Sequence, residues 1–167
     1  MSNPIENVKK KIIDWLTVEG YQPEDVSDKD LQALFNILAK VAGGHPYHIV
    51  QKKDKQDCFF IACNLVLTPQ QLSLLAKMGK EKRWSYFWNL RLRLLTHQNL
   101  GDFEIKPNPP KRVTEIFISS KPIYYDALTK NRVISTLIDV YKSTMMAIWM
   151  LEQTAGVPVS STESMYV

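Results

Sequence analysis

The sequence predicts an α+β protein in which an antiparallel sheet of about five strands is packed by three helices, in the order α-β-β-β-α-β-β-α. Three observations support this. Apolar residues recur at helical spacing near the start, in the middle and near the end of the chain. Bulky, extended-type runs separated by turn residues lie between those stretches. Finally, 167 residues, 45% of them hydrophobic, can bury a sizeable core.

We expect residues 1–153 to form a single domain and residues 154–167 a mobile tail, because the tail has no periodicity. The N-terminus lacks an apolar signal region, and the longest apolar run, 58–67, is too short for a membrane span. These features favour a cytoplasmic protein without a membrane partner. The net charge of +4 permits contact with nucleic acid but does not require it, because the basic residues form short, scattered clusters.

Local signals mark the ends of the first two helical stretches. Asn3 is a candidate N-cap followed by Pro4 at the first helical position, and Gly20 is placed to end that helix. Thr68 repeats the capping pattern after the third extended run. The helix that follows is expected to kink or break at Gly79.

The stretch from Val26 to Ala42 fits a helix and a strand equally well by pattern. The turn residues 43–46 follow it, and an extended run resumes at Tyr47, so a hairpin accounts for both arms and favours the strand. The remaining strands are expected within 47–53, 58–67, 102–106 and 113–124.

The central helix is unusually apolar. At 100° per residue its apolar side chains sweep an arc of roughly 200°, wider than the stripe of a surface helix, so we expect the helix to be covered on two sides. Arg91 falls near the middle of this arc. It is expected to pair with a carboxylate such as Glu104 or Glu115, to bury its aliphatic stem with its charged head in water, or to anchor a partner in a binding cleft. The arc consists of Trp84, Phe87, Trp88, Leu90, Leu92, Leu94 and Leu95.

The last helix, capped by Asp126 or Thr129, has a polar outer face that turns apolar at its C-terminal end. There the outer line reads Met146, Ala147 and Met150, which are candidate partner-binding residues because methionine forms adaptable contact surfaces. Cover by the tail or by a strand is the alternative. The inner face is expected to consist of Val133, Ile134, Leu137, Ile138, Tyr141, Met145, Ile148 and Trp149.

No motif indicates an enzyme. The sequence has no glycine-rich phosphate loop, nucleophile elbow or H-E-x-x-H motif, so we expect no nucleotide, no cofactor and no catalytic residue. Cys58 and Cys63 would lie too far apart on one strand for a disulfide and would face opposite sides of it, which disfavours a metal site with His45 and His48. His97 and Asp126 are read as a half-exposed helix residue and an N-cap rather than catalytic groups.

Three segments resemble a small uncharacterised family of prokaryotic, largely archaeal, proteins. They are WNLRLRLL in the central helix, SKPIYYDALTKNRVISTLIDV leading into the last helix, and the closing AIWMLEQ. The element order of such proteins is similar to the type III secretion chaperone-like α+β fold, which implies a strand at residues 31–41. The family brings no established activity, whereas proteins of the chaperone-like fold commonly dimerise and hold partner polypeptides.

We therefore expect a non-enzymatic protein-interaction or chaperone-like module that forms a homodimer or binds another polypeptide. The alternative is a nucleic-acid-binding protein that uses its scattered basic patches with the nearby aromatics Tyr47, Tyr124 and Tyr125.

Overall fold

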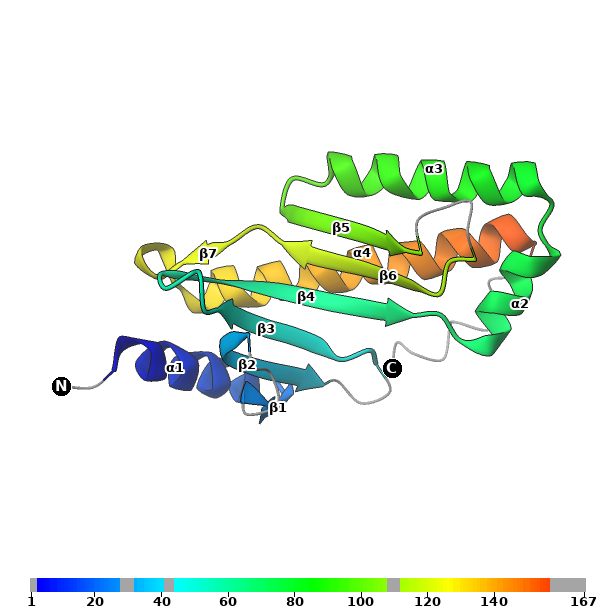
Figure 1. Cartoon of the computed structure of the whole chain (residues 1–167). Coiled ribbons are helices and arrows are strands. Elements are labelled where there is room, and N and C mark those ends of the chain that lie inside the picture. Colours follow the sequence, from blue (N-terminus) through cyan, green and yellow to red (C-terminus); the bar gives the residue numbers. More distant parts are fainter. Residues whose placement is uncertain (1–2, 28–31, 41–43, 108–111, 157–167) are drawn as a thin grey trace.

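A computed structural model describes residues 3–27, 32–40, 44–107 and 112–156 and shows one antiparallel sheet with helices against one of its faces (Figure 1). The expected tail therefore lies, from residue 157 on, outside the described residues. In chain order the elements are α1 (Pro4–Val18), β1 (Gln22–Asp25), β2 (Ala33–Lys40), β3 (Tyr47–Lys52), β4 (Cys58–Val66), α2 (Pro69–Lys77), α3 (Lys80–Thr96), β5 (Leu100–Lys106), β6 (Glu115–Ser120), β7 (Ile123–Tyr124), the short 3-10 helix η2 (Tyr125–Ala127) and α4 (Lys130–Ala155).

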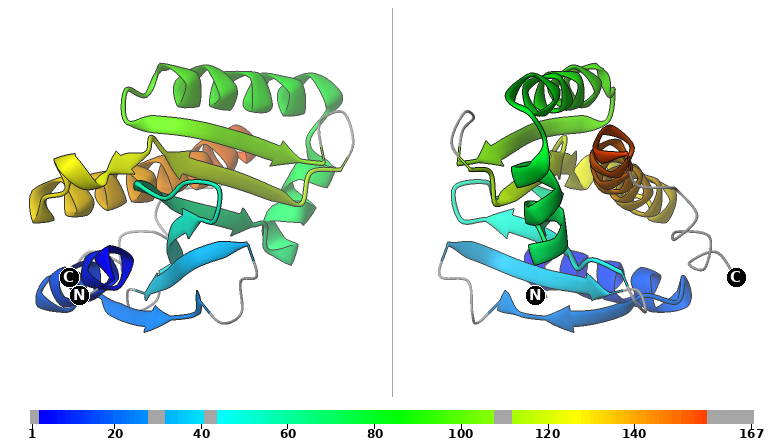
Figure 2. Two further views of the ribbon diagram at one scale, coloured as in Figure 1. Left: turned by 60° about the vertical axis from the view of Figure 1, so that its left-hand side comes forward. Right: turned by 90° about the vertical axis from the view of Figure 1, so that its right-hand side faces the viewer.

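The sheet has the order β1-β2-β3-β4-β6-β5, and β7 pairs with one end of β4. Every pairing is antiparallel. Figure 2 shows α1 and α4 on one face of the sheet and α3 above its β5 edge, while none of the described helices lies on the opposite face. The α+β class and the antiparallel sheet are thus confirmed.

The expected count and order of elements are wrong. The described residues contain seven strands and four α-helices rather than about five and three. The sequence pattern missed β1, a four-residue strand that contains Pro23. It also joined β6 to β7, which Lys121 and Pro122 separate. The break expected at Gly79 is present and makes α2 and α3 two separate helices.

The helix caps form as predicted. The side chain of Asn3 accepts a hydrogen bond from the Ile5 amide at 3.1 Å, and Thr68 forms a complete capping box with Gln71. Gly20 follows α1 with a positive φ of 82°, a conformation that costs glycine little. Of the two candidates for the last helix, Thr129 is the N-cap.

The ambiguous stretch is a strand over Ala33–Lys40. Phe35, Ile37 and Ala39 alternate along it and are fully buried against the helices. The segment also fitted a helical pattern, because a strand with apolar side chains on both faces has them at nearly every position. On the other face Leu34 and Leu38 are half-buried and Asn36 is buried.

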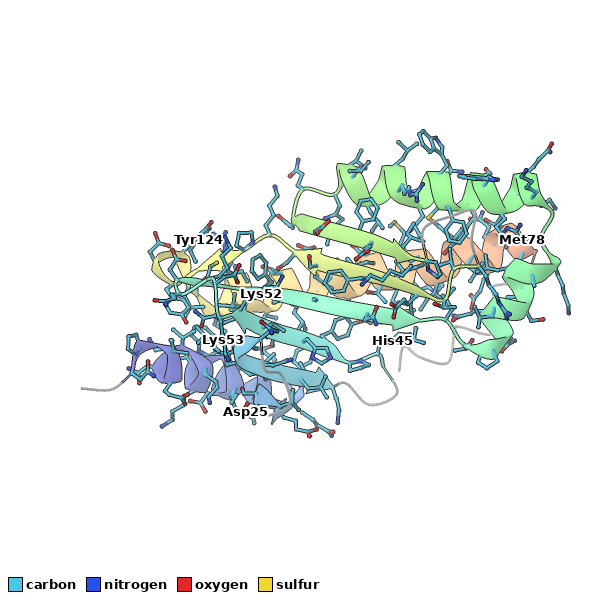
Figure 3. All side chains as sticks on the ribbon, in the orientation of Figure 1. Asp25, His45, Lys52, Lys53, Met78 and Tyr124 are labelled. Carbon is cyan, nitrogen blue, oxygen red and sulfur yellow. The ribbon has the colours of Figure 1, made fainter. Side chains whose placement is uncertain are left out.

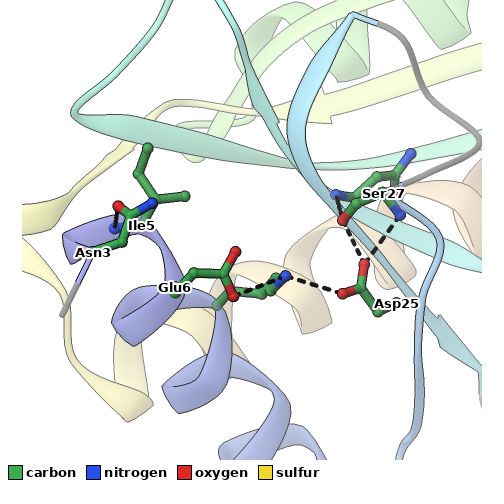
Figure 4. A network of polar contacts seen from close by, with 7 residues as sticks. Asn3, Ile5, Glu6, Asp25 and Ser27 are labelled. Carbon is green, nitrogen blue, oxygen red and sulfur yellow. Dashed lines mark hydrogen bonds and ion pairs between the residues drawn. The ribbon is translucent and has the colours of Figure 1, made fainter.

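An ion-pair network ties α1 to β1 (Figure 4). The ammonium of Lys9 contacts Glu6 at 3.0 Å and Asp25 at 3.1 Å. The other carboxylate oxygen of Asp25 accepts hydrogen bonds from the backbone and the hydroxyl of Ser27. The Ser27 hydroxyl in turn accepts a hydrogen bond from the Asn36 amide on β2 at 3.0 Å. The network therefore connects the first helix to the first two strands.

Acid should weaken this network. Burial by itself would raise the pKa of Asp25, but the hydrogen bonds from Ser27 and the contact with Lys9 outweigh it and lower the pKa. A lowered folded-state pKa contributes stability that is present above about pH 4 and is lost as the pH falls through that pKa. Because the carboxylate is partly exposed, we expect a contribution of at most about 1 kcal/mol.

Urea unfolding of the wild type and of Asp25→Asn at pH 5 and pH 3 measures this contribution. The variant should lose less stability between the two pH values than the wild type. Asp14→Asn, on the exposed side of α1, is the control for removing a surface carboxylate. Equal losses in the wild type and Asp25→Asn would contradict the assignment.

Candidate functional site

The most unusual surface of the molecule is one side of α3. Four large apolar side chains are exposed there: Trp84 at 39%, Trp88 at 57%, Leu92 at 44% and Leu95 at 70%. We call these four residues the α3 stripe. The buried side of the helix consists of Tyr86, Phe87, Leu90 and Leu94. The expectation that this helix is covered on two sides is therefore wrong, because the described chain covers only one.

Tyr86 fixes which side of α3 faces the core. It is buried, and its hydroxyl donates to the Ala147 carbonyl of α4 at 3.0 Å. Burial raises the pKa of Tyr86, so the phenol keeps its proton. Its ring also lies 4.8 Å from that of Phe87, centroid to centroid. The hydrogen bond from Tyr86 to Ala147 holds one side of α3 against α4, so Trp84 and Trp88 point away from α4.

Three members of the α3 stripe, together with Arg91, have the spacing of a coiled-coil seam. Trp84, Trp88, Arg91 and Leu95 follow one another at intervals of four, three and four residues, the repeat with which two helices interlock. Arg91, which is half-buried, lies between Trp88 and Leu95 on this line. Of the carboxylates expected to bind Arg91, Glu104 pairs with Lys106 at 3.1 Å and Glu115 accepts from Asn64 at 2.9 Å.

The predicted outer line of α4 is not an exposed patch. Ala147 is fully buried, so its expected place on the outer surface is wrong. Met146 and Met150 are half-buried and pack against the core. The sequence indicated an apolar helix end correctly, but α4 contacts the sheet, α2 and α3, and these elements cover that end. The roles of Met146 and Met150 in partner binding stay predictions.

Two residues assigned to the inner face of α4 lie outside. Ile138 and Trp149 are exposed, whereas Val140, Thr144 and Leu151 are buried in their place. Packing of α3 against α4 explains the rotation, since the Tyr86 contact at Ala147 draws that side of α4 inward. No sequence pattern carried this signal, because α4 has apolar residues on both candidate faces.

The remaining candidate residues lie on different elements of the fold. His97 is the C-cap residue of α3, and its Nδ1 accepts from the Asn99 amide at 3.3 Å. Asp126 is exposed on η2. Cys58 and Cys63 are buried and free on β4, and burial raises the pKa of Cys63 to about 11. Among the described residues, no group of three His, Cys, Asp or Glu side chains could hold a metal ion.

The tyrosines named for nucleic-acid binding do not form a surface. Tyr47 is fully buried, and Tyr125 donates its hydroxyl to the side chain of the buried Gln51. Tyr124 alone of the three is exposed, at the β7 end of the sheet (Figure 3). These three tyrosines therefore do not provide the aromatic platform expected beside the basic patches, and nucleic-acid binding stays a prediction.

Tyr47 and Tyr86 give opposite predictions for removal of a hydroxyl. The Tyr47 hydroxyl is buried without a hydrogen-bond partner in the described part of the chain, so Tyr47→Phe should leave stability unchanged or raise it by up to about 1 kcal/mol. Tyr86→Phe removes a buried hydrogen bond and should lower the free energy of unfolding by about 1 kcal/mol. Urea titrations of both variants test the pair, and a larger loss in Tyr47→Phe than in Tyr86→Phe would contradict it.

Comparison with known families decides where the chain belongs. A family model described as "Uncharacterized conserved protein (DUF2299)" matches residues 8–151. The chain is a DUF2299 protein. A crystal structure of an uncharacterized protein from Methanothermobacter thermautotrophicus is similar to this DUF2299 chain with a TM-score of 0.77 and 25% identity, over 87% of this chain and 97% of that one. No curated protein matches the sequence. The expected resemblance to an uncharacterised family is thus confirmed, and its function is unknown.

None of the helices described in this DUF2299 chain combines the length and the apolar character needed to cross a membrane.

Proposed function

We propose that this protein is a non-enzymatic protein-interaction module of the chaperone-like kind, and that it self-associates through the α3 stripe. The exposure of four large apolar side chains along one line of α3 carries the proposal. A contiguous apolar line of this kind, bordered by polar residues, is typical of an interaction surface. Two tryptophans lie on it and Arg91 lies beside it, and both residue types are enriched in binding hot spots.

A second copy of α3 fits this surface. Intervals of four, three and four residues read the same in both directions, so two copies can pack antiparallel about a two-fold axis between Asn89 and Leu90. Trp84 then lies opposite Leu95 of the other copy, and Trp88 opposite Arg91. A guanidinium over an indole face is a favourable cation–π contact. The second copy would therefore add a cation–π contact to Arg91.

The charges of α3 are compatible with this pairing. The helix carries five basic side chains and one acidic one, so a parallel pair would juxtapose like charges. In the antiparallel pair, Lys80, Lys82 and Arg83 at the N-terminal end face the uncharged region from Thr96 to Asn99 of the other copy. Cations near the C-terminal end of a helix interact favourably with its macrodipole. Electrostatics thus favours the antiparallel arrangement over the parallel one.

The chaperone-like part of the proposal rests on the α+β class and the antiparallel sheet, which this chain shares with the fold that its sequence resembles. Proteins with that similarity commonly dimerise, which supports self-association.

Light scattering coupled to size-exclusion chromatography tests the proposal. We expect the wild type to elute with twice the chain mass of 19.3 kDa and Trp88→Arg to elute as a monomer. Trp149→Arg, at an exposed tryptophan of α4, is the matched control and should remain dimeric. Circular dichroism of each variant verifies folding. A monomeric wild type, or dissociation by Trp149→Arg but not by Trp88→Arg, would overturn the proposal.

The arginine contact has a test of its own. Arg91→Lys keeps the positive charge but removes the planar guanidinium, so it should weaken the dimer less than Arg91→Glu. A dimer that Arg91→Glu leaves unchanged would exclude the antiparallel register described above.

A further inference from the structure

A hollow of about 370 Å³ lies in the sheet face that α1 and α4 leave open. Its floor is the cross-strand pair Ala62 and Ser119, two small residues directly opposite each other on β4 and β6. Phe60 and Phe117, two residues away on the same strands, line the hollow on opposite sides. A short floor between two phenyl rings leaves room for one flat apolar group. The α3 stripe contributes nothing to this lining.

The two ends of the hollow carry opposite charges. Asp102 on β5 lies opposite Ser119 and provides the acidic end. Lys52 on β3 provides the basic end, and its ammonium extends over the Phe60 ring at 6.0 Å from the centroid. Figure 3 shows this lysine side chain over the strands of the open face. In the part of the chain that the structure describes, no carboxylate pairs with Lys52. Its charge is therefore available to a ligand.

The distance between the charged ends selects the length of a ligand. Asp102 on β5 and His48 on β3 lie at the same level of the sheet, because pairing runs from Asp102 through β6 and β4 to His48. Lys52 is four residues beyond His48 along β3. Strand spacings of about 4.8 Å and rises of about 3.3 Å per residue separate the two Cα atoms by roughly 20 Å. Both side chains extend toward the middle of the hollow, so the Asp102 carboxylate and the Lys52 ammonium are about 11 Å apart. This is close to the length of three extended residues.

We propose that this hollow binds a short peptide with free termini and an aromatic side chain. Its amino group lies at Asp102, its carboxylate at Lys52, and its ring on Ala62 and Ser119 between the two phenylalanines. A tripeptide matches the charge at each end and the span between them, and its ring matches the apolar floor. This site is independent of self-association through α3, so either proposal can fail alone.

The probe is the tripeptide Gly-Phe-Gly, with binding followed by chemical-shift changes in the ¹⁵N-labelled full chain. N-acetylation of the peptide should weaken binding to the wild type about two- to fivefold, as should C-terminal amidation, because each removes one exposed ion pair. Acetylation should have no effect on Asp102→Asn, and amidation should have none on Lys52→Gln. Blocking effects that persist unchanged in these variants would refute the assigned orientation.

Filling the floor gives an independent test. Ala62→Phe places a ring where the ligand ring should lie and should weaken binding at least tenfold, whereas Val66→Phe, on the same face of β4 but outside the lining, should not. Chromatographic mass verifies that both variants assemble like the wild type. Unchanged binding to Ala62→Phe, no binding of Gly-Phe-Gly to the wild type, or tighter binding of a nucleoside monophosphate than of the peptide would overturn the proposal.

Discussion

Leu90→Ala should lower the free energy of unfolding by about 3 to 5 kcal/mol, because it leaves a cavity where a fully buried leucine was. Leu90 lies one turn after Tyr86 on the core side of α3. Its side chain belongs to the same buried cluster as Leu94 and Leu100. The cavity would open between α3 and the rest of the core.

Leu95→Ala is the matched control on the same helix. Leu95 is 70% exposed, so its truncation should change stability by less than about 0.5 kcal/mol. Both variants are measured by urea titration at concentrations where the chain is monomeric, since association through the α3 stripe would otherwise add to stability. Comparable losses at the two positions would mean that α3 packs with a different face inward.

Gly101→Ala should be the second strongly destabilising change. A Cβ atom at Gly101 would lie 2.5 Å from the Ser120 carbonyl oxygen and 2.9 Å from its carbon. The register of β5 and β6 shifts at this point, between Leu100 and Asp102, and glycine permits the close approach of the two backbones. We expect a loss of about 1 to 3 kcal/mol, because β5 must move away from β6.

Gly79→Ala is the control for Gly101→Ala. It shows whether the loss of stability comes from the steric contact with Ser120 or from replacing any glycine by alanine. A Cβ atom at Gly79 meets nothing within 4 Å, and its φ of −61° is accessible to alanine. The change should therefore cost less than about 1 kcal/mol. Thermal unfolding of the two variants compares them directly, and an equal shift in Tm would contradict the steric explanation.

Elements with local signals could be predicted from the sequence. Asn3 and Thr68 bind backbone amides two or three residues away, so the residues that begin α1 and α2 are contained in the sequence around them. The strand at Ala33–Lys40 required a longer argument, from the turn that follows it. By contrast, β1 and β7 are too short, and lie too close to Pro23 and Pro122, to produce an alternating pattern.

The orientation of α3 could not be predicted for a different reason. Its buried side and its exposed stripe are adjacent around the helix, so the sequence shows one wide apolar arc. Only the contact between Tyr86 and Ala147, residues far apart in the chain, divides that arc into a covered and an open part. The hollow in the sheet could not be predicted for the same reason: Ala62 and Ser119 are distant in the sequence and become neighbours only through strand pairing.

The position of β4 also has a consequence for folding kinetics. On one side β4 pairs with β3, which precedes it along the chain through a short turn. On the other side it pairs Val66 with Glu115, which the chain reaches only after two helices and β5. Closing the larger loop has the greater entropic cost, so the hairpin should form before β6 docks. The rate-limiting barrier then lies in joining the two halves of the sheet.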